Sequence, residues 1–511
     1  MENGLKETLT GMKLTMGRSF YLKSNGVSSI MKPKLRILVF AGFGGFTQRL
    51  DNTFHLLSKE LDLEIDFLVF GKNNYRYLID KAKVNYKDIY CIDEFLDQYK
   101  SDIQKNSFID KIDKNLCRTK HNKMAYVGRN IVQHTHFTHY ARDVDHDKIK
   151  YYISFMYNKL KSIVSVVDRA FCYTCASIES EIIYDVCKEL NIPFMTLNEQ
   201  RIGYRWSIND NNMDINNAAL KEYREIQKEP TQEGISYLEE TLNRVESGNK
   251  NIIEKKFQGK RIESKKLNIQ NLYNLGKNFF LLKEDVPFAP TRSQRLRANF
   301  NFKIREFFTH RYLSYKIPKE PYVYFPMPMI PEATTLVRNP DNYDILGLIK
   351  RISLQIPLDF KLVVREHPSM IGTTPISVYN EIKKIYNVVL LSPFTSNYEC
   401  IKHSKLIITN TGTVGLESLL LLKKTIVLGS TMYADLNTVF STSDLSKIEE
   451  ILEMDEEIQK KAQKNDLQSY YSCLHRNSFE DKSRVFWSRD AFNPEILETD
   501  RELCNHLKSK F

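Results

Sequence analysis

The sequence has no run of about 18 or more apolar residues, which is the length that a membrane-spanning helix needs. Near residue 1 it also lacks the apolar core and the cleavage site of a secretory signal. These absences argue against an integral membrane protein and against an exported one. We therefore expect a cytoplasmic protein, and attachment to the inner face of the membrane is left open.

Cysteine is sparse, with 8 residues in 511 and no regular spacing. This excludes the disulfide-rich secreted class and is typical of reduced thiols in a cytosolic protein. Cys172 and Cys175 form a CxxC pair inside an apolar, strand-like run, without a second pair elsewhere. Core packing is the ordinary interpretation of this pair, and a zinc or redox site is the alternative.

The sequence also lacks the signature of a nucleic-acid-binding module. Its 74 Lys and Arg residues are dispersed among 63 Asp and Glu residues, which leaves a formal net charge of +11. Such a surface favours anionic partners, among them nucleotide sugars, anionic lipids and charged glycans. We expect no nucleic-acid partner.

The chain is too long for one hydrophobic core, so its 511 residues indicate two or three domains. Residues 1–34 form a basic N-terminal arm that precedes the first strand, expected at 35–41. A turn at Gly42, Gly44 and Gly45, a helix at 48–61 and a strand at 63–70 then complete a β-loop-α unit. GxGxxG is missing, so this turn predicts a loop at the domain cleft and no dinucleotide cofactor.

A second set of elements completes the N-terminal domain. A strand at 169–174, a helix at 177–190 and a strand at 192–198 lead to Glu199 and Arg201 at a strand's carboxyl end. We predict a Rossmann-like domain over 35–210 and a helical insertion or bridge over 211–320. Within the bridge, residues 292–311 interleave arginines with phenylalanines. An amphipathic helix that packs its phenylalanines is the ordinary interpretation, and docking on a membrane or an acidic glycan is the alternative.

The C-terminal domain, predicted over 321–440, contains the most informative stretch of the chain. Strands are expected near 322–326, 361–365, 388–391, 406–409 and 425–428, and residues 441–511 form C-terminal helices. After 406–409 the loop Asn410-Thr411-Gly412-Thr413 opens a helix, where backbone N–H groups, hydroxyls and the helix dipole favour a phosphate. Ordinary N-capping by the threonines is the alternative.

The strand at 361–365 ends in a second polar loop, Glu366-His367-Pro368. Ligands of open α/β sheets bind beyond the carboxyl ends of the strands, so the two loops are expected to share one crevice. Alternation along the strand places Arg365 and His367 on one face and turns Glu366 away.

Four stretches, in this order and spacing, resemble the capsular polysaccharide biosynthesis family of bacterial glycosyltransferases. They are 322–326 (YVYFP), 331–335 (PEATT), 365–368 (REHP) and 409–417 (TNTGTVGLE). The family includes Kdo transferases and is similar to bacterial polysialyltransferases and, more distantly, to polyol-phosphate transferases of wall polymers. The resemblance, which covers about 320–435, implies the GT-B class, an α/β fold with two Rossmann-like domains facing a cleft.

The resemblance also implies an activity, namely transfer of a sugar from a nucleotide donor to a glycan or glycolipid acceptor without a cofactor or a metal. A CMP-activated acidic sugar such as Kdo or sialic acid is favoured. A CDP-polyol phosphotransferase and a non-catalytic glycan-binding assembly protein are the alternatives. The donor-binding candidates are Arg365, Glu366, Pro368, Asn410, Thr411, Gly412, Thr413 and Glu417.

The candidate catalytic residues follow from the same chemistry. His367 is expected to donate a hydrogen bond or proton to the departing phosphate. The general base is expected to be Glu199, beside Arg201, or Glu332, with Asp51 as a third candidate. A histidine-rich run, His134, His136 and His139 with His146 beyond it, suggests a metal site, but no carboxylate completes a metal motif. We expect no metal.

Overall fold

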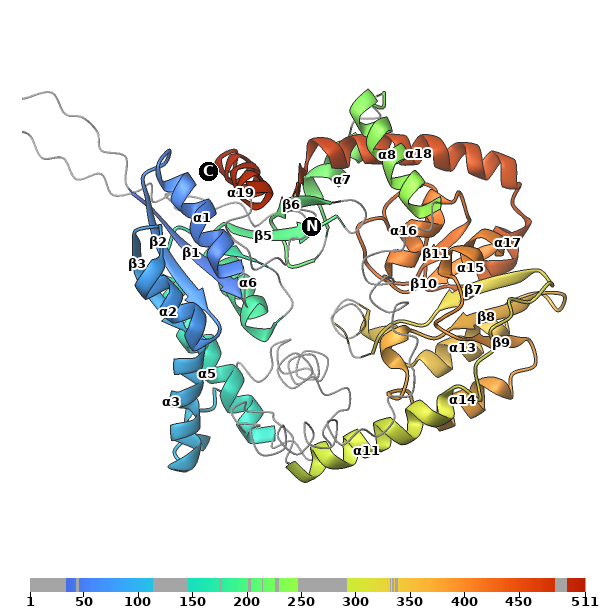
Figure 1. Ribbon diagram of the computed structural model, residues 1–511, viewed down its shortest axis with the longest axis horizontal. Helices are drawn as coiled ribbons and strands as arrows, with labels where there is room; N and C mark the ends of the chain where they lie inside the picture. The colour runs from blue at the N-terminus through green and yellow to red at the C-terminus, as the bar shows by residue number, and fades with distance from the viewer. Residues whose placement is uncertain are drawn as a thin grey trace, which may run out of the picture. The chain divides into compact units, whose positions relative to one another are not determined.

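The structure is a computed structural model, and it describes residues 34–42, 46–113, 146–173, 177–200, 204–213, 215–225, 229–246, 292–330, 332, 335, 339–482 and 494–510. Within these residues the strands form two separate sheets. Figure 1 shows the strands and helices of the first sheet mostly in blue and green and those of the second in yellow to red. The chain thus builds two α/β units in succession.

The first sheet has, within the described residues, seven strands in the order β13-β6-β5-β4-β1-β2-β3. They are β1 (Leu35–Gly42), β2 (Leu63–Val69), β3 (Tyr86–Cys91), β4 (Arg169–Cys172), β5 (Phe194–Glu199), β6 (Arg205–Asn209) and β13 (Phe479–Glu480). Strands β1 to β5 are parallel and, read from β3, follow the order 3-2-1-4-5 of doubly wound α/β folds. Antiparallel β6 and β13 extend the sheet beyond β5.

Helices cover both faces of this sheet. They include α1 (Phe46–Ser58), α2 (Lys72–Lys81), α3 (Ile92–Gln104), α5 (His146–Val164), α6 (Ile178–Leu190) and α19 (Pro494–Lys508). Alternate side chains of β1 enter two different cores. Leu38 and Phe40 belong to the core with α3, α5 and α6, whereas Ile37 and Val39 belong to the core with α1 and α19. This burial on both faces explains why the strands read as nearly continuous apolar runs.

The second sheet is parallel throughout its described strands, in the order β12-β11-β10-β7-β8-β9. They are β7 (Tyr322–Pro326), β8 (Lys361–Arg365), β9 (Val388–Leu391), β10 (Leu406–Thr409), β11 (Thr425–Val427) and β12 (Phe440–Ser441). Read from β9 this is the order 3-2-1-4-5-6, in which the chain winds one way from β7 and the other way from β10. The topological switch point therefore lies between β7 and β10.

The helices of the second unit again form layers on the two faces of the sheet. They are α13 (Ile345–Ser353), α14 (Ile376–Lys383), α15 (Asn397–His403), α16 (Thr413–Leu420) and α17 (Ile448–Glu453). Helices α13, α14 and α17 share one core with β7, β8 and β10. Helix α15 packs in a second core with β7, β8 and β9 residues, and α16 packs in a third.

Four more helices come from the predicted bridge and the C-terminal segment. Three belong to the bridge, α7 (Asn217–Glu225), α8 (Gln232–Glu246) and α11 (Arg292–Thr309), and the long α18 (Glu456–Arg476) belongs to the C-terminal segment. Helix α18 packs on α7 and α8, and the chain then adds β13 to the first sheet and packs α19 on α1. Buried Asp500 of α19 accepts from Arg49 at 2.9 Å and from Asn52 at 3.0 Å. The C-terminal segment therefore completes the N-terminal sheet.

The predicted fold class, α/β with two Rossmann-like domains, is confirmed. The strands expected at 322–326, 361–365, 388–391 and 406–409 coincide with β7 to β10. The prediction lacked β3, β6, β12 and β13. β12 and β13 are only two residues long, and β3 (YKDIYC) has two adjacent charged residues and little burial. The domain boundaries stay predictions. Among the described residues, no helix combines the length and apolar character that crossing a bilayer requires.

Candidate functional site

The switch point brings the predicted loops to one edge of the second sheet. β7 lies between β8 and β10, and the three strands run in the same direction. Three segments therefore begin at neighbouring carboxyl ends: the segment after β7, the His367 loop after β8 and the Asn410 loop after β10. In doubly wound folds this is where ligands bind.

The Asn410 loop holds the start of α16 in a defined shape. Gly412 is the N-cap residue, with extended backbone, and the Tyr433 hydroxyl donates to its carbonyl. A Cβ atom on Gly415 would overlap the Tyr433 ring, so glycine at 415 lets the two approach. The loop is tied to β11 because the N–H of Gly429 donates to Asn410 O at 3.0 Å. The first N–H groups of α16 precede any intrahelical acceptor and can serve an anion.

Asn410 is the most informative residue of this loop. Its side chain is 2% exposed, and neither its amide nitrogen nor its amide oxygen has a hydrogen-bond partner among the described residues. A buried amide without partners costs about 1–3 kcal/mol, and native proteins rarely leave one unexplained. A ligand that bonds to this amide would remove that cost.

Two further buried polar atoms in the loops of this sheet have no partner within the described part of the chain. They are the amide nitrogen of Asn339, before α13, and the hydroxyl oxygen of Thr395, between β9 and α15. Asn339 lies beside the Asn410 loop, since a Cβ on Gly429 would touch both Asn339 and Thr411. Asn339 and Thr395 were not predicted, because no periodicity or motif in the sequence marks a polar atom that will be buried unpaired.

His367 lies at the start of the short 3-10 helix Pro368–Met370, where its Nδ1 accepts from the N–H of Ser369 at 3.2 Å. A backbone N–H can only donate, so the ring is neutral there and carries its proton on Nε2. Burial lowers the pKa of His367, while nearby Glu332 raises it and Arg365 lowers it. His367 is thus a neutral hydrogen-bond donor. It lies close to Glu332, so the structure brings two of the predicted catalytic residues together.

Glu366 is fully buried and points away from the loop surface, as the alternation predicted. Its carboxylate accepts from the Tyr379 hydroxyl at 2.6 Å, from Thr374 at 3.2 Å and from the N–H of His367 at 2.6 Å. Burial raises the pKa of Glu366. These contacts fix the backbone of His367, and contact of Glu366 with a donor stays a prediction.

Arg365 is also engaged by the protein. Its guanidinium donates to the carbonyls of Thr395 at 3.0 Å and Pro393 at 2.6 Å, and only 9% of the residue is exposed. Arg365 therefore holds the loop between β9 and α15. Its charge remains close enough to lower the pKa of His367, so it contributes to the potential of the site.

Glu417 is connected to the sheet through buried hydrogen bonds. The Asn397 amide donates to Glu417 at 2.6 Å and accepts from the Tyr324 hydroxyl at 2.7 Å. Thr413 and Glu417 are both half-buried on α16, whereas Thr411 is buried. Contact of Thr411, Thr413 or Glu417 with a donor stays a prediction.

The remaining predicted residues belong to the first sheet. Gly42 ends β1 with φ +65°, a conformation that favours glycine. Glu199 is exposed at the end of β5 and pairs with Trp206 of β6, so its role as a base stays a prediction. Asp51 is fully buried and accepts from Tyr77 and from the N–H groups after α2, so its candidacy as a base is wrong.

Several predictions fall on parts of the chain outside the described residues. They concern Gly44, Gly45, Arg201, Cys175, His134, His136, His139 and the arm 1–33. Cys172 is buried in β4. Among the described residues, no group of three His, Cys, Asp or Glu side chains could hold a metal ion.

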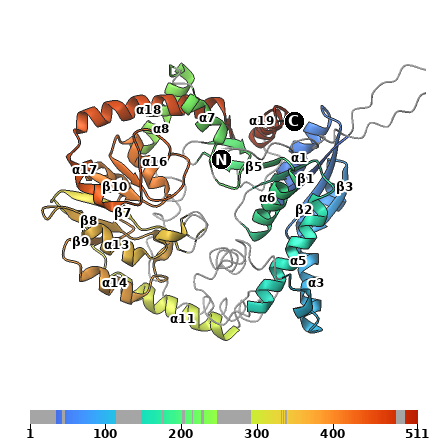
Figure 2. The same cartoon turned by 180° about the vertical axis from the view of Figure 1, so that it is seen from behind.

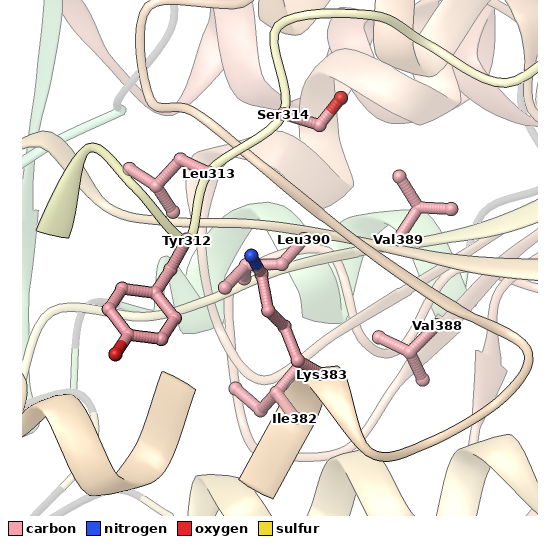
Figure 3. Close-up of a pocket in the computed structure, with 8 residues that line it drawn as sticks. All are labelled: Tyr312, Leu313, Ser314, Ile382, Lys383, Val388, Val389 and Leu390. Carbon is pink, nitrogen blue, oxygen red and sulfur yellow. The ribbon is translucent and has the colours of Figure 1, made fainter. Parts of the chain in front are cut away.

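A cavity of about 290 Å³ lies at the β9 edge of the second sheet (Figure 3). Its lining residues are Tyr312, Leu313, Ser314, Ile382, Lys383, Val388, Val389 and Leu390. They are mostly apolar, and the Lys383 ammonium donates to the carbonyl of Arg311 at 3.1 Å. None of them is a predicted site residue, and the walls offer no converging polar groups, so we do not assign the activity to this cavity.

No protein-family model matches the sequence, and no curated protein matches it either. Among solved structures, the β-Kdo 2,7 transferase of KpsC from Thermosulfurimonas dismutans is similar at 13% identity, over 69% of this chain and 88% of that chain, with a TM-score of 0.30. The β-Kdo 2,4 transferase of the same protein matches at 12% identity, over 54% and 73%, with a TM-score of 0.26. UDP-GlcNAc 2-epimerase from Neisseria meningitidis, bound to UDP-GlcNAc, matches at 10% identity, over 86% and 98%, with a TM-score of 0.24. TM-scores this low assign neither a family nor an activity to the chain.

Proposed function

We propose that this protein is a glycosyltransferase of surface or capsular polysaccharide synthesis, which transfers a sugar from a nucleotide donor to a glycan or glycolipid acceptor. A CMP-activated acidic sugar is the favoured donor, on the sequence resemblance of the His-Pro and Asn410 loops. The observation that carries the proposal is the buried amide of Asn410 where α16 begins, at the topological switch point, which has no hydrogen-bond partner among the described residues. A polar ligand at this position would supply such a partner.

The residues divide the reaction between them. The acceptor hydroxyl forms a bond to the anomeric carbon as the bond from that carbon to the donor phosphate breaks, and a base removes the hydroxyl proton. The departing phosphate gains negative charge, which the N–H groups at the start of α16 and the positive end of its dipole stabilise. His367 can donate a hydrogen bond from Nε2–H to that phosphate, because Nδ1 already accepts from the N–H of Ser369.

The base is assigned to Glu332 or Glu199. Glu332 is close enough to His367 to raise its pKa. Its carboxylate can therefore accept the acceptor's proton beside the neutral histidine. Glu332 follows β7, the strand between the two strands that carry the donor loops, whereas Glu199 belongs to the first sheet. This favours Glu332 over Glu199 as the base.

The first test is a thermal-shift panel of CMP, CDP, UMP, UDP, GDP and ADP, with and without magnesium. At about 100 times its dissociation constant, a true ligand stabilises the fold by about 2.7 kcal/mol. CMP selectivity without magnesium supports an acidic-sugar transferase. A preference for CDP moves the assignment to polyol-phosphate transfer, and no shift with any nucleotide favours a glycan-binding protein.

Turnover provides the second test. We expect His367→Ala to abolish transfer from CMP-activated sugar while the unfolding temperature stays within a few degrees of the wild type. Thr413→Val should weaken nucleotide binding in calorimetry, because it removes a hydroxyl where the phosphate is expected. The control is Ser446→Ala, in the short helix after β12. It should leave turnover and nucleotide binding unchanged. Normal turnover of His367→Ala would exclude the role given to the histidine.

A further inference from the structure

Helix α11 carries exposed apolar side chains on a face that no described element covers. Phe300 is 67% exposed, Phe307 66%, Ile304 41% and Phe308 38%. The spacing from 300 to 304 and 307 places them along one side of the helix. The prediction that the helix packs its phenylalanines is therefore wrong for Phe300, Phe307 and Phe308. It is confirmed for Phe302.

The opposite side of α11 is fixed to the second unit. Phe302 packs on Gly372, whose φ is +79° and where a Cβ would lie 2.9 Å from the Phe302 ring. Arg305 donates to the carbonyl of Thr373 at 3.0 Å, and Thr309 is fully buried. Figure 1 and Figure 2 both show one end of α11 next to α14, and the two helices are in contact. The helix therefore cannot roll to bury its exposed phenylalanines without breaking these contacts.

Cations flank the exposed apolar side chains. Arg297, Lys303 and Arg311 are exposed on the helix or just after it, and Arg311 lies over the Phe308 ring at 5.0 Å. Glu306 is paired with Lys303 at 2.6 Å. Exposed Tyr315 and Lys316 continue the same character beyond the helix. Among the described residues of this stretch, positive charge exceeds negative charge.

These features fit one kind of partner better than the others. Phenylalanines that stand out between cations can enter the acyl boundary of a bilayer while arginine and lysine reach the phosphates. A soluble acidic glycan would satisfy the cations but would offer no apolar phase for the phenylalanines. A second copy of this chain would bring a like positive charge to the same face.

We propose that α11 docks this protein on the surface of an anionic lipid bilayer, with Phe300, Ile304 and Phe307 inserted and Arg297, Lys303 and Arg311 on lipid phosphates. The inference rests on the exposed face of α11 alone and does not depend on the proposed transferase activity. It gives the positive charge around α11 a binding partner, the lipid phosphates, that is separate from the nucleotide donor.

The test is flotation of the full-length protein with vesicles of phosphatidylcholine, with or without about 30% phosphatidylglycerol. We expect binding to the anionic vesicles and its loss when salt is raised from about 0.1 M to about 0.5 M. The double variant Phe300→Ser/Phe307→Ser should lower the partition coefficient at least about tenfold, because two insertions are lost. Arg297→Ala/Arg311→Ala should lower it at low salt and flatten the salt dependence.

The matched control is Leu354→Ser/Leu358→Ser, which removes two side chains that are 81% and 96% exposed away from α11. It should bind like the wild type. Failure of the wild type to bind anionic vesicles, or equal binding by the phenylalanine variant, would overturn the proposal. It would also be overturned if the wild type forms dimers in analytical ultracentrifugation that the phenylalanine variant does not form.

Discussion

Asn397, the first residue of α15, and Asn410, in the loop before α16, are both buried, but their amides differ in hydrogen bonding. Asn397 bonds through both ends of its amide, to Tyr324 and Glu417, whereas the Asn410 amide has no partner among the described residues. We expect Asn397→Leu to lose about 2–4 kcal/mol of unfolding free energy, because buried partners are left unpaired. Asn410→Leu should stay within about 1 kcal/mol of the wild type or exceed it, and should lose the nucleotide-induced thermal shift.

Urea denaturation of the two variants, with and without the selected nucleotide, checks this prediction. A large loss of stability in Asn410→Leu without ligand would mean that its amide is paired in solution, and the argument for a ligand there would fall. The comparison separates a residue kept for structure from one kept for binding.

The pKa of His367 makes a pH prediction. Burial holds it below its ordinary value of 6.5 in the folded protein. Between 6.5 and that lower value the unfolded chain binds a proton that the folded chain does not, so stability falls as pH drops through this window. We expect the loss of stability from pH 7 to pH 5 to be smaller in His367→Gln than in the wild type.

Urea midpoints at pH 5, 6 and 7 measure this difference, and an NMR titration of the ring protons measures the pKa directly. Burial also lowers the pKa values of His55, His475 and His506, so these histidines make the stability of both proteins depend on pH. Only the difference between the two proteins reports on His367. A titration midpoint above 6.5 would show that Glu332 outweighs the burial.

At the scale of the element, the start of α16 depends on the contact between Gly415 and Tyr433. In an exposed helix Gly→Ala stabilises by about 1 kcal/mol, but here the added methyl group would displace the tyrosine. We expect Gly415→Ala to cost about 1–3 kcal/mol and to weaken the nucleotide-induced shift. Tyr433→Phe, which removes only the hydroxyl on Gly412, should cost about 1 kcal/mol. Thermal unfolding of both variants tests this, and a more stable Gly415→Ala would contradict it.

The elements also show where sequence patterns succeed. β7 to β10 were placed from their apolar runs, because parallel strands covered on both faces have few polar positions. β6 was missed since its sequence, RWSIN, mixes polar and apolar residues and its partner β13 comes from the far end of the chain. The α11 pattern predicted an amphipathic helix, but the period alone does not state which side another element will cover.

At the scale of the whole molecule, the last helix stabilises the first sheet. Asp500 of α19 is buried with Arg49 of α1, and burial raises the Asp500 pKa while Arg49 lowers it. We expect Asp500→Ala to cost about 3–5 kcal/mol, because it leaves Arg49 buried without its counter-charge. Glu498→Ala on the same helix removes an exposed pair with Lys482 and should cost less than about 1 kcal/mol. Equal losses in urea denaturation would mean that α19 does not pack on α1 in solution.

The sequence by itself determined the α/β class, the two Rossmann-like units and the polar loops at the strand ends, because these depend on local apolar runs and turn residues. It also placed His367 beside Pro368 and Gly412 at the start of α16. Only the tertiary structure decided that Glu366 and Arg365 position loops, that Asn410 is buried without a partner among the described residues and that Phe300 and Phe307 of α11 stay exposed. These properties depend on which distant segments come to cover a residue, and a local pattern specifies the face of an element but not what lies against it.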